Sequence, residues 1–395
     1  MAHYIPQGFR FASLYSGIKQ DTSRSDMTLI VSDVDAVGAG VYTQNLVCAA
    51  PVVLDRSRTP GSHFRSIFAI SGNANACTGE RGYRDAVRMA ELAGEVLGTP
   101  AESTLVLSTG IIGHFLPMET IEKGCREIVP HLASDETALD GVARGLMTTD
   151  TVPKCFTKKV LIDGVEITLA GLAKGSGMIA PNMATFLGVV LTDAKLNPAA
   201  AQKLLQNVAD KTLNCVTVEG HTSTNDTLLM LGNGLSGSAD VTENPAFVAA
   251  VEEICEAMAR SIASDGEGAS HLVTIHVHGT KTVSDARKIA REIAESALVK
   301  CAFTGNDPNW GRIVSAAGYA GVAFDVAQVS LDVNGFRLFE KGSPVAFDAA
   351  EVSRSMRENR EITVDLRLGE GTEEIRFWTC DLTTEYVHIN ADYHT

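Results

Sequence analysis

A single threonine hydroxyl stands where a glycine-rich loop turns into an apolar strand, in KGSGMIAPNMATFLGVVLTDA (residues 174–194). Lys174 supplies a cation nearby, and glycines between it and Thr185 leave room for a reacting group. If the Ala184–Thr185 peptide bond were broken, Thr185 would carry a free α-amine beside its hydroxyl. Because such an amine has a pKa of about 7.7–8.0, it can act as a general base near neutrality. Cleavage would therefore create the base and expose the nucleophile in one event.

Glycine patterns elsewhere resemble nucleotide-binding loops. Gly232–Gly237 (GNGLSG) fits GxGxxG and follows an apolar run over Thr227–Leu231. The dinucleotide motif needs a helix that opens at its last glycine, whereas the next helical pattern begins only near Pro245. Gly175–Ala180 fits a looser GxGxxA but leads into a strand, and Ser71–Ala76 is predicted to be a loop of small residues. We therefore predict turns at these places and no nucleotide cofactor.

Metal-binding signals are weak. His276 and His278 share one face of a predicted strand, but no cysteine or carboxylate lies at ligand spacing from them in the sequence. We expect a solvated strand face and no metal site. The acidic segment from Glu370 to Glu374 is predicted to be a solvated loop.

Composition narrows the class of protein. The net charge of −15 over 395 residues argues against nucleic acid as a partner, and an anionic substrate would need local cations. No apolar run approaches the roughly 18 residues of a membrane helix, and the N-terminus lacks the apolar core of a signal peptide. Eight scattered cysteines without a CxxC pair are predicted to be reduced and mostly buried. These features favour a cytoplasmic protein without membrane contact.

Alternating helix and strand patterns cover nearly the whole length, which is enough for two to three domains. They predict a mixed α/β fold whose strands are not all parallel. Helices are expected over 81–97, from Pro198 to about Leu213, and from Pro245 onward. Strands are expected over 160–169, as a hairpin turning at Asp163–Gly164, over 185–191 as a buried strand, and around 273–277 with one wet face.

The motif KGSGMIAPNMAT, which ends at Thr185, resembles the autoprocessing signature of the glutamate N-acetyltransferase (ornithine acetyltransferase) family. Further matches follow in the family's order: GFRFASLYSGIK near the start, AGVYTQN from Ala39, SGNANACTG from Ser71, LSTGIIG from Leu107, MTTDTVPK from Met147, TSTNDT from Thr222, SDGEG from Ser264, DPNWGRI from Asp307 and the C-terminal CDLTTEYVHINADYHT. Each motif is weak by itself, but the ordered set covers almost the entire chain. The chain departs from the family's pattern at His221, where an acidic residue is common, and at Thr304-Gly305-Asn306.

The resemblance implies an α/β fold of layered sheets and helices, with the chemistry of N-terminal-nucleophile hydrolases rather than their chain connectivity. It also implies self-cleavage between Ala184 and Thr185 into an α chain, residues 1–184, and a β chain, residues 185–395. The two chains would stay entwined and assemble as α2β2.

The activity implied is transfer of an acetyl group from N-acetylornithine to glutamate, in arginine biosynthesis, through a ping-pong acetyl-threonine ester. Thr185 would be the nucleophile and its α-amine the base, with Thr109 and Gly110 forming the oxyanion hole. The family's substrate-binding positions match Thr151, Lys174, Thr185, Glu267, Asn390 and Thr395. No metal or organic cofactor is implied, and acetyl-CoA is a candidate co-substrate if the enzyme is bifunctional.

Two other functions stay open at this point. An N-terminal-threonine amidohydrolase or aminopeptidase would use the same Thr185 but pass the acyl group to water. An uncleaved small-molecule binding protein would carry Thr185 as a structural residue, since β-branched side chains favour strands.

Overall fold

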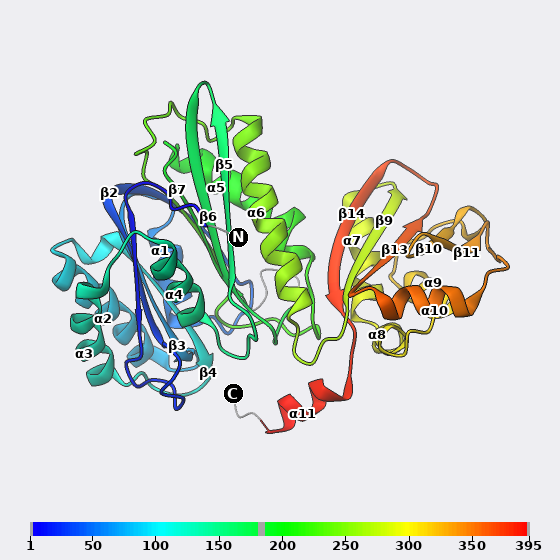
Figure 1. The fold of residues 1–395 in the computed structure, drawn as a ribbon, viewed down its shortest axis with the longest axis horizontal. Coiled ribbons are helices and arrows are strands. Elements are labelled where there is room, and N and C mark those ends of the chain that lie inside the picture. The colour runs from blue at the N-terminus through cyan, green and yellow to red at the C-terminus, as the bar shows by residue number, and fades with distance from the viewer. Residues whose placement is uncertain (1–2, 181–185, 393–395) are drawn as a thin grey trace.

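The computed structural model describes residues 3–180 and 186–392 of the chain. They form two β-sheets with helices packed against them (Figure 1). Within these ranges, every helix is too short or too polar to cross a membrane. The α/β fold class and the mixture of parallel and antiparallel strands that the sequence predicts are both confirmed.

The first sheet has eight strands, in the order β4-β3-β2-β8-β7-β6-β5 with β1 beside β2. The pairs β3–β4 and β7–β8 are parallel, and the other neighbours are antiparallel. The bounds are β1 Phe9–Leu14, β2 Met27–Tyr42, β3 Gly61–Asn73, β4 Thr104–Ile111, β5 Lys154–Ile162, β6 Val165–Lys174, β7 Leu187–Thr192 and β8 Thr227–Gly232.

Strand β2 belongs to both halves of this sheet. It pairs with β3 over Met27–Val31 and again at Ala36 and Gly38, with register shifts between these places, and its last part, Val37–Tyr42, pairs with β8. Such irregularities bend a strand. The two halves consequently face each other across one apolar core, in which Leu107 of β4 and Val189 of β7 belong to the same cluster.

Helices cover the two outer faces of the folded sheet. On the β3–β4 side lie α2 (Gly79–Leu97) and α3 (Met118–Ile128), and on the β6–β8 side lie α5 (Pro198–Lys211) and α6 (Pro245–Ser264). Layers of helix, sheet, sheet and helix are visible from left to centre in Figure 1. The shorter helices α1 (Ala50–Arg58) and α4 (Glu136–Leu146) contribute side chains to the inner core.

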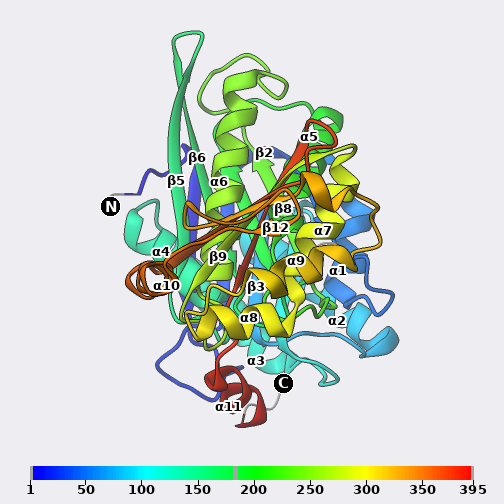
Figure 2. The same cartoon turned by 90° about the vertical axis from the view of Figure 1, so that its right-hand side faces the viewer.

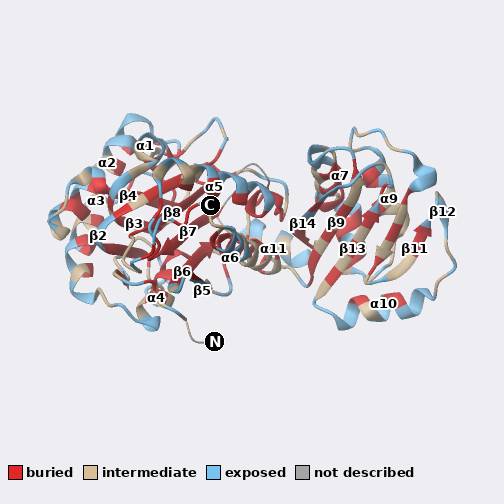
Figure 3. Cartoon of the chain, turned by 90° about the horizontal axis from the view of Figure 1, so that it is seen from above, coloured by how far each residue is buried: buried red, intermediate tan, exposed pale blue. Residues whose placement is uncertain are grey.

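The second sheet has six strands in the order β12-β11-β10-β13-β9-β14. Buried residues of β9 and β13 share one core cluster with residues of α7 and α9, and these strands are coloured as largely buried in Figure 3. Helix α6 lies between the two sheets and contacts strands of both. The last helix, α11, follows β14 and lies below both sheets in Figures 1 and 2. The bounds are β9 Leu272–Thr280, α7 Val283–Glu295, α8 Ala297–Thr304, α9 Trp310–Gly318, β10 Ser330–Val333, β11 Phe336–Glu340, β12 Ser343–Pro344, α10 Ala349–Glu358, β13 Glu361–Arg367, β14 Glu373–Cys380 and α11 Thr384–Asp392.

Local sequence signals account for the elements that were predicted correctly. The helices α5 and α6 each begin with a proline after an asparagine whose side chain accepts hydrogen bonds from the first turn. The hairpin turns at Asp163 and Gly164, both at positive φ. The stretch Gly232–Gly237 leaves β8 and leads to no helix before Pro245, as expected.

Two expectations for loops were wrong. Residues Ser71–Asn73 continue β3, because they pair with the end of β4. Glu373 and Glu374 begin β14, where they pair with β9. In both places a neighbouring strand supplies the hydrogen bonds, and that neighbour is distant in the sequence.

The eight cysteines are free, as predicted, but only Cys125, Cys215, Cys255 and Cys380 are buried. The expectation that most of them lie in the core is therefore met for half of the set.

The proposed α/β chain boundary, Ala184–Thr185, lies outside the described residues. Its flanking strands are β6 and β7, which pair with each other, so that Lys174 lies opposite Leu187. Residues on both sides of the boundary thus belong to one sheet rather than to separate folded units.

Candidate active site

A cavity of about 100 Å³ opens beside the ends of β4 and β6. It brings together Thr109, Gly110, Lys174, Glu267 and Asn390, which the sequence predicts as site residues. The full lining is Ala74, Thr109, Gly110, Ile112, Thr148, Thr149, Lys174, Gly177, Met178, Ser223, Thr224, Asn225, Glu267 and Asn390. Of the other predicted residues, Ala184, Thr185 and Thr395 lie outside the described residues.

The predicted oxyanion hole lies at the end of β4. Gly110 has φ +133°, a conformation that favours glycine, and a Cβ there would lie 2.3 Å from the carbonyl carbon of Gly72. Thr109 beside it is 6% exposed. Close approach of β3 therefore requires glycine at this position, and Gly110 lines the cavity beside Thr109.

Lys174, the last residue of β6, is buried and donates a hydrogen bond from Nζ to Thr109 Oγ1 at 3.1 Å. An ammonium group can only donate, so the threonine oxygen accepts and its own hydrogen can point into the cavity. Burial lowers the pKa of Lys174, and the carboxylates of Asp150, Asp226 and Glu267 oppose that effect.

A buried cluster of charged side chains supports the end of β6 and the glycine loop that follows it. Asp150 Oδ1 accepts hydrogen bonds from Lys154 Nζ at 2.7 Å and from the Gly175 amide at 2.6 Å. Lys154 Nζ also donates to Asp265 Oδ2 at 2.6 Å. Burial by itself would raise the pKa of Asp150, but the charges of Lys154 and Lys174 outweigh it and lower that pKa to about 2. The carboxylate thus stays ionised and holds the start of the glycine loop.

Thr151 is placed differently from the expectation. It is not part of the cavity lining, and both its backbone N–H and its hydroxyl donate to the Asp265 carboxylate. Thr148 and Thr149 line the cavity instead, and the Thr149 hydroxyl lies 2.7 Å from Ser176 Oγ. The sequence motif contains all three threonines, but only the path of the chain decides which of them face the cavity.

Glu267 and Asn390 form the acidic side of the cavity. The Glu267 amide donates to Ser176 O at 2.9 Å, and Gly177 leaves space for its carboxyl group, because a Cβ there would lie 2.3 Å from Glu267 Cδ. Asn390, on α11, donates from Nδ2 to Glu267 Oε2 at 2.8 Å. The C-terminal helix thereby completes a cavity whose described lining includes the Lys174 ammonium as well as this carboxylate.

Asn225 is a lining residue that motif reasoning did not single out. Its Nδ2 donates to Ala74 O at 2.6 Å and to Ser108 O at 2.8 Å, which ties the start of β8 to the ends of β3 and β4. The Thr227 amide donates to Phe186 O at 3.1 Å. The first described residue after Thr185 is therefore bound next to the cavity-lining segment.

Glu219 does not line the cavity, but it lies near Glu267. Its loop carries no chemical motif, so the sequence did not single it out. Burial, reinforced by the nearby Glu267 carboxylate, raises the pKa of Glu219 to about 8. The same surroundings raise the pKa of Tyr386, on α11, to about 12. A proton on Glu219 near neutral pH lessens the repulsion between Glu219 and Glu267.

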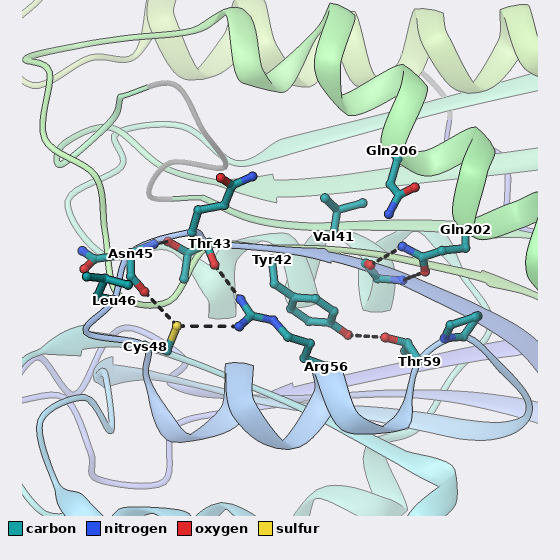
Figure 4. A pocket seen from close by; sticks show the side chains of 13 residues that line it. Val41, Tyr42, Thr43, Asn45, Leu46, Cys48, Arg56, Thr59, Gln202 and Gln206 are labelled. Atoms are coloured by element: carbon teal, nitrogen blue, oxygen red, sulfur yellow. Dashed lines mark hydrogen bonds between the residues drawn. The ribbon is translucent and has the colours of Figure 1, made fainter.

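A larger cavity of about 730 Å³ lies elsewhere, between the end of β2 and helices α1 and α5 (Figure 4). Among the described residues that line it, Arg56 alone is charged, and its guanidinium donates to Thr43 O at 2.6 Å. Gln202 likewise exchanges hydrogen bonds with the backbone of Gly40. Because these polar groups bond to one another, the cavity offers little chemistry, and the smaller one is the better candidate.

Comparisons with known proteins give one consistent answer. The ArgJ family model matches residues 10–395. Arginine biosynthesis bifunctional protein ArgJ of Rhodopirellula baltica is 44% identical over 100% of this chain and 97% of its own length, and the protein of that name from Symbiobacterium thermophilum is 45% identical over 99% and 98%. The crystal structure of the Bacillus halodurans protein of that name is 34% identical with a TM-score of 0.51, and the match covers 52% of this chain and 98% of that chain.

Proposed function

Because the chain belongs to the ArgJ family, we propose that the cavity between Thr109 and Glu267 is the active site of an N-acetyltransferase of arginine biosynthesis. The enzyme transfers the acetyl group of N2-acetyl-L-ornithine to L-glutamate and gives L-ornithine and N-acetylglutamate. Relatives that align over nearly their whole length carry this pathway in their names.

One observation carries the assignment: the same cavity is lined by Lys174, Glu267 and the Thr109–Gly110 pair. Both amino-acid substrates have an α-carboxylate, which the Lys174 ammonium can bind. Glu267 is suited to the cationic side-chain amine of ornithine. Thr109 and Gly110 supply the two donors that a developing oxyanion needs.

The reaction follows from these positions. Thr185 Oγ attacks the acetyl carbon, and the α-amine of Thr185 takes the hydroxyl proton. When the C–N bond breaks, that proton passes to the departing ornithine amine, and the acetyl group remains as a threonine ester. The amine of glutamate then attacks the ester carbon, loses a proton to the α-amine, and Thr185 Oγ leaves with a proton restored.

The α-amine arises by self-cleavage between Ala184 and Thr185, which gives an α chain of residues 1–184 and a β chain of residues 185–395. The solved Bacillus halodurans chain supports this division, since 52% of the present chain covers almost all of it. Pairing of β6 with β7 keeps the two products together after cleavage. We propose assembly of the cleaved chains as α2β2.

The mechanism needs no metal or organic cofactor, because the ester stores the acetyl group between the half-reactions. Acetyl-CoA is a candidate second donor, which would make N-acetylglutamate afresh. Free thiols at all eight cysteines suit a reducing compartment and support a cytoplasmic location.

The decisive test is whether the active protein is cleaved between Ala184 and Thr185. Denaturing electrophoresis and N-terminal sequencing of active protein should give two fragments, one of which starts at Thr185. Thr185→Ala should remain a single chain of 41.9 kDa without transfer activity, while Thr185→Ser should keep both properties in part. Full activity in an unbroken wild-type chain, or turnover by Thr185→Ala, would contradict the mechanism.

Products distinguish the transferase from an amidohydrolase. With N-acetylornithine and excess glutamate, the transferase forms N-acetylglutamate, whereas an amidohydrolase releases acetate. A parallel assay with acetyl-CoA and glutamate tests the second donor.

A further inference from the structure

The face of the second sheet that contacts α6 gathers two histidines and two carboxylates from three adjacent strands. His276 and His278 alternate with buried residues along β9. Asp365 of β13 pairs in register with His276, and Glu374 of β14 pairs with His278. No carboxylate lies at ligand spacing from these histidines in the sequence, because both acids come from other strands.

The distances suit a metal ion. Glu374 Oε2 lies 3.2 Å from His276 Nε2 and 3.5 Å from His278 Nδ1, and one ligand atom from each residue lies within 4.8 Å of the others. Zinc–ligand bonds of about 2.0–2.2 Å place the ligand atoms of a tetrahedral site about 3.3–3.6 Å apart. The two contacts to Glu374 are close to these values before any rearrangement.

Asp365 occupies the other side of both rings. Its Oδ1 lies 3.1 Å from His278 Nε2 and 3.6 Å from His276 Nδ1. A carboxylate that accepts from the ring nitrogen opposite the metal is the usual partner of metal-binding histidines, because it sets the tautomer and the ring orientation. The rings themselves lie with their centroids 3.5 Å apart.

Neighbouring cations are directed elsewhere. Arg367, opposite His278, donates to Asp332 Oδ2 at 2.7 Å, and Arg376, opposite His276, lies 3.9 Å from Glu256 Oε1. The side chains of His276 and His278 are about one-fifth exposed, at 20% and 22%, so an ion can reach them from solvent.

We propose that His276, His278 and Glu374 bind a divalent transition-metal ion, best matched by Zn²⁺, with Asp365 as the orienting carboxylate. His276 and Glu374 also line a cavity of about 270 Å³, which leaves space for water at a fourth position. This cavity shares no lining residue with the active-site cavity in the described ranges. The ion would connect β9 to the edge strand β14, which leads into α11.

Titration of the full-length, chelator-treated protein with Co²⁺ tests the site, because tetrahedral Co²⁺ with nitrogen ligands absorbs visible light. One equivalent should bind per chain, and Zn²⁺ should displace it and raise Tm. The double variant His276→Gln/His278→Gln should lose the absorption and the Tm shift but keep acetyl transfer, which shows that it is folded. Asp365→Asn should still bind, about 10- to 100-fold more weakly.

His63→Gln is the matched control, since His63 is exposed on β3 in the other sheet and should not alter binding. No Co²⁺ absorption in the wild type, or equal binding by the double variant, would overturn the proposal. In that case the cluster is a set of ion pairs only. Either result is independent of whether Thr185 is the nucleophile.

Discussion

Lys174 Nζ lies 3.1 Å from Thr109 Oγ1, although the two residues are 65 positions apart and belong to opposite halves of the folded sheet. The contact joins the end of β6 to the end of β4. It also orients the threonine hydroxyl, whose oxygen accepts from the lysine and whose hydrogen can then face a substrate oxygen. One hydrogen bond thus links the cation that we propose as the substrate-binding group to the hydroxyl that we propose as an oxyanion donor.

Replacement of Thr109 by valine should lower kcat by about 10²- to 10³-fold, because one donor to the developing oxyanion is lost. KM should change little, since the donor acts mainly in the transition state. Thr109→Ser, which keeps the hydroxyl, is the control. Steady-state kinetics of acetyl transfer measure both constants, and a valine variant with normal kcat would remove Thr109 from the oxyanion hole.

Gly110→Ala should damage both folding and catalysis. Its Cβ would meet the backbone of Gly72 and Asn73 at 2.3–2.5 Å, and φ +133° is strained for any other residue. We expect the free energy of unfolding to fall by about 1–3 kcal/mol or more. Gly113 also has a positive φ, but a Cβ there would have no neighbour within 4 Å. Gly113→Ala therefore measures the cost of backbone strain without a steric clash. Chemical denaturation compares the two, and equal losses would argue against the close approach of β3.

Glu267→Gln should raise KM for N-acetylornithine more than KM for glutamate, because we propose that the lost charge binds the side-chain amine of ornithine. A hydrogen bond to a charged group contributes about 1.5–3 kcal/mol, which corresponds to roughly a 10- to 100-fold effect. Glu358→Gln, at the exposed end of α10, should leave both constants unchanged. Equal changes for both substrates in Glu267→Gln would place the carboxylate away from the ornithine side chain.

Lys154→Met should destabilise the protein by about 3–5 kcal/mol, since it leaves Asp150 and Asp265 as buried charges without their shared cation. Lys159→Met is the comparison, because the ion pair of Lys159 with Glu166 is exposed and therefore contributes little to stability. Urea denaturation at neutral pH measures the difference. Similar losses in the two variants would mean that the buried cluster does not stabilise the fold.

Stability should depend on pH through Glu219. Because its folded pKa, about 8, lies above the usual value of 4.5, the folded state binds the extra proton between these values. The contribution is present below pH 4.5 and is lost as pH rises through 8, so the free energy of unfolding should decrease by a few kcal/mol over this window. Glu219→Gln should flatten the curve, and an unchanged slope in that variant would show that Glu219 titrates normally.

The sequence alone predicted local secondary structure. Asparagine before proline marks the starts of α5 and α6, and Asp163–Gly164 marks a hairpin, because capping and turn geometry depend on adjacent residues. The ordered motifs likewise identified the family, since their order is a property of the sequence.

Tertiary structure decided which side chains meet. Thr151 turned out to bind Asp265 while Thr148 and Thr149 line the cavity, and Glu374 came to lie beside His276 and His278 from a segment expected to be a loop. Contacts of this kind depend on strand order, on register and on the bend in β2. No short stretch of sequence encodes these, because they arise only when segments about a hundred residues apart pack against each other.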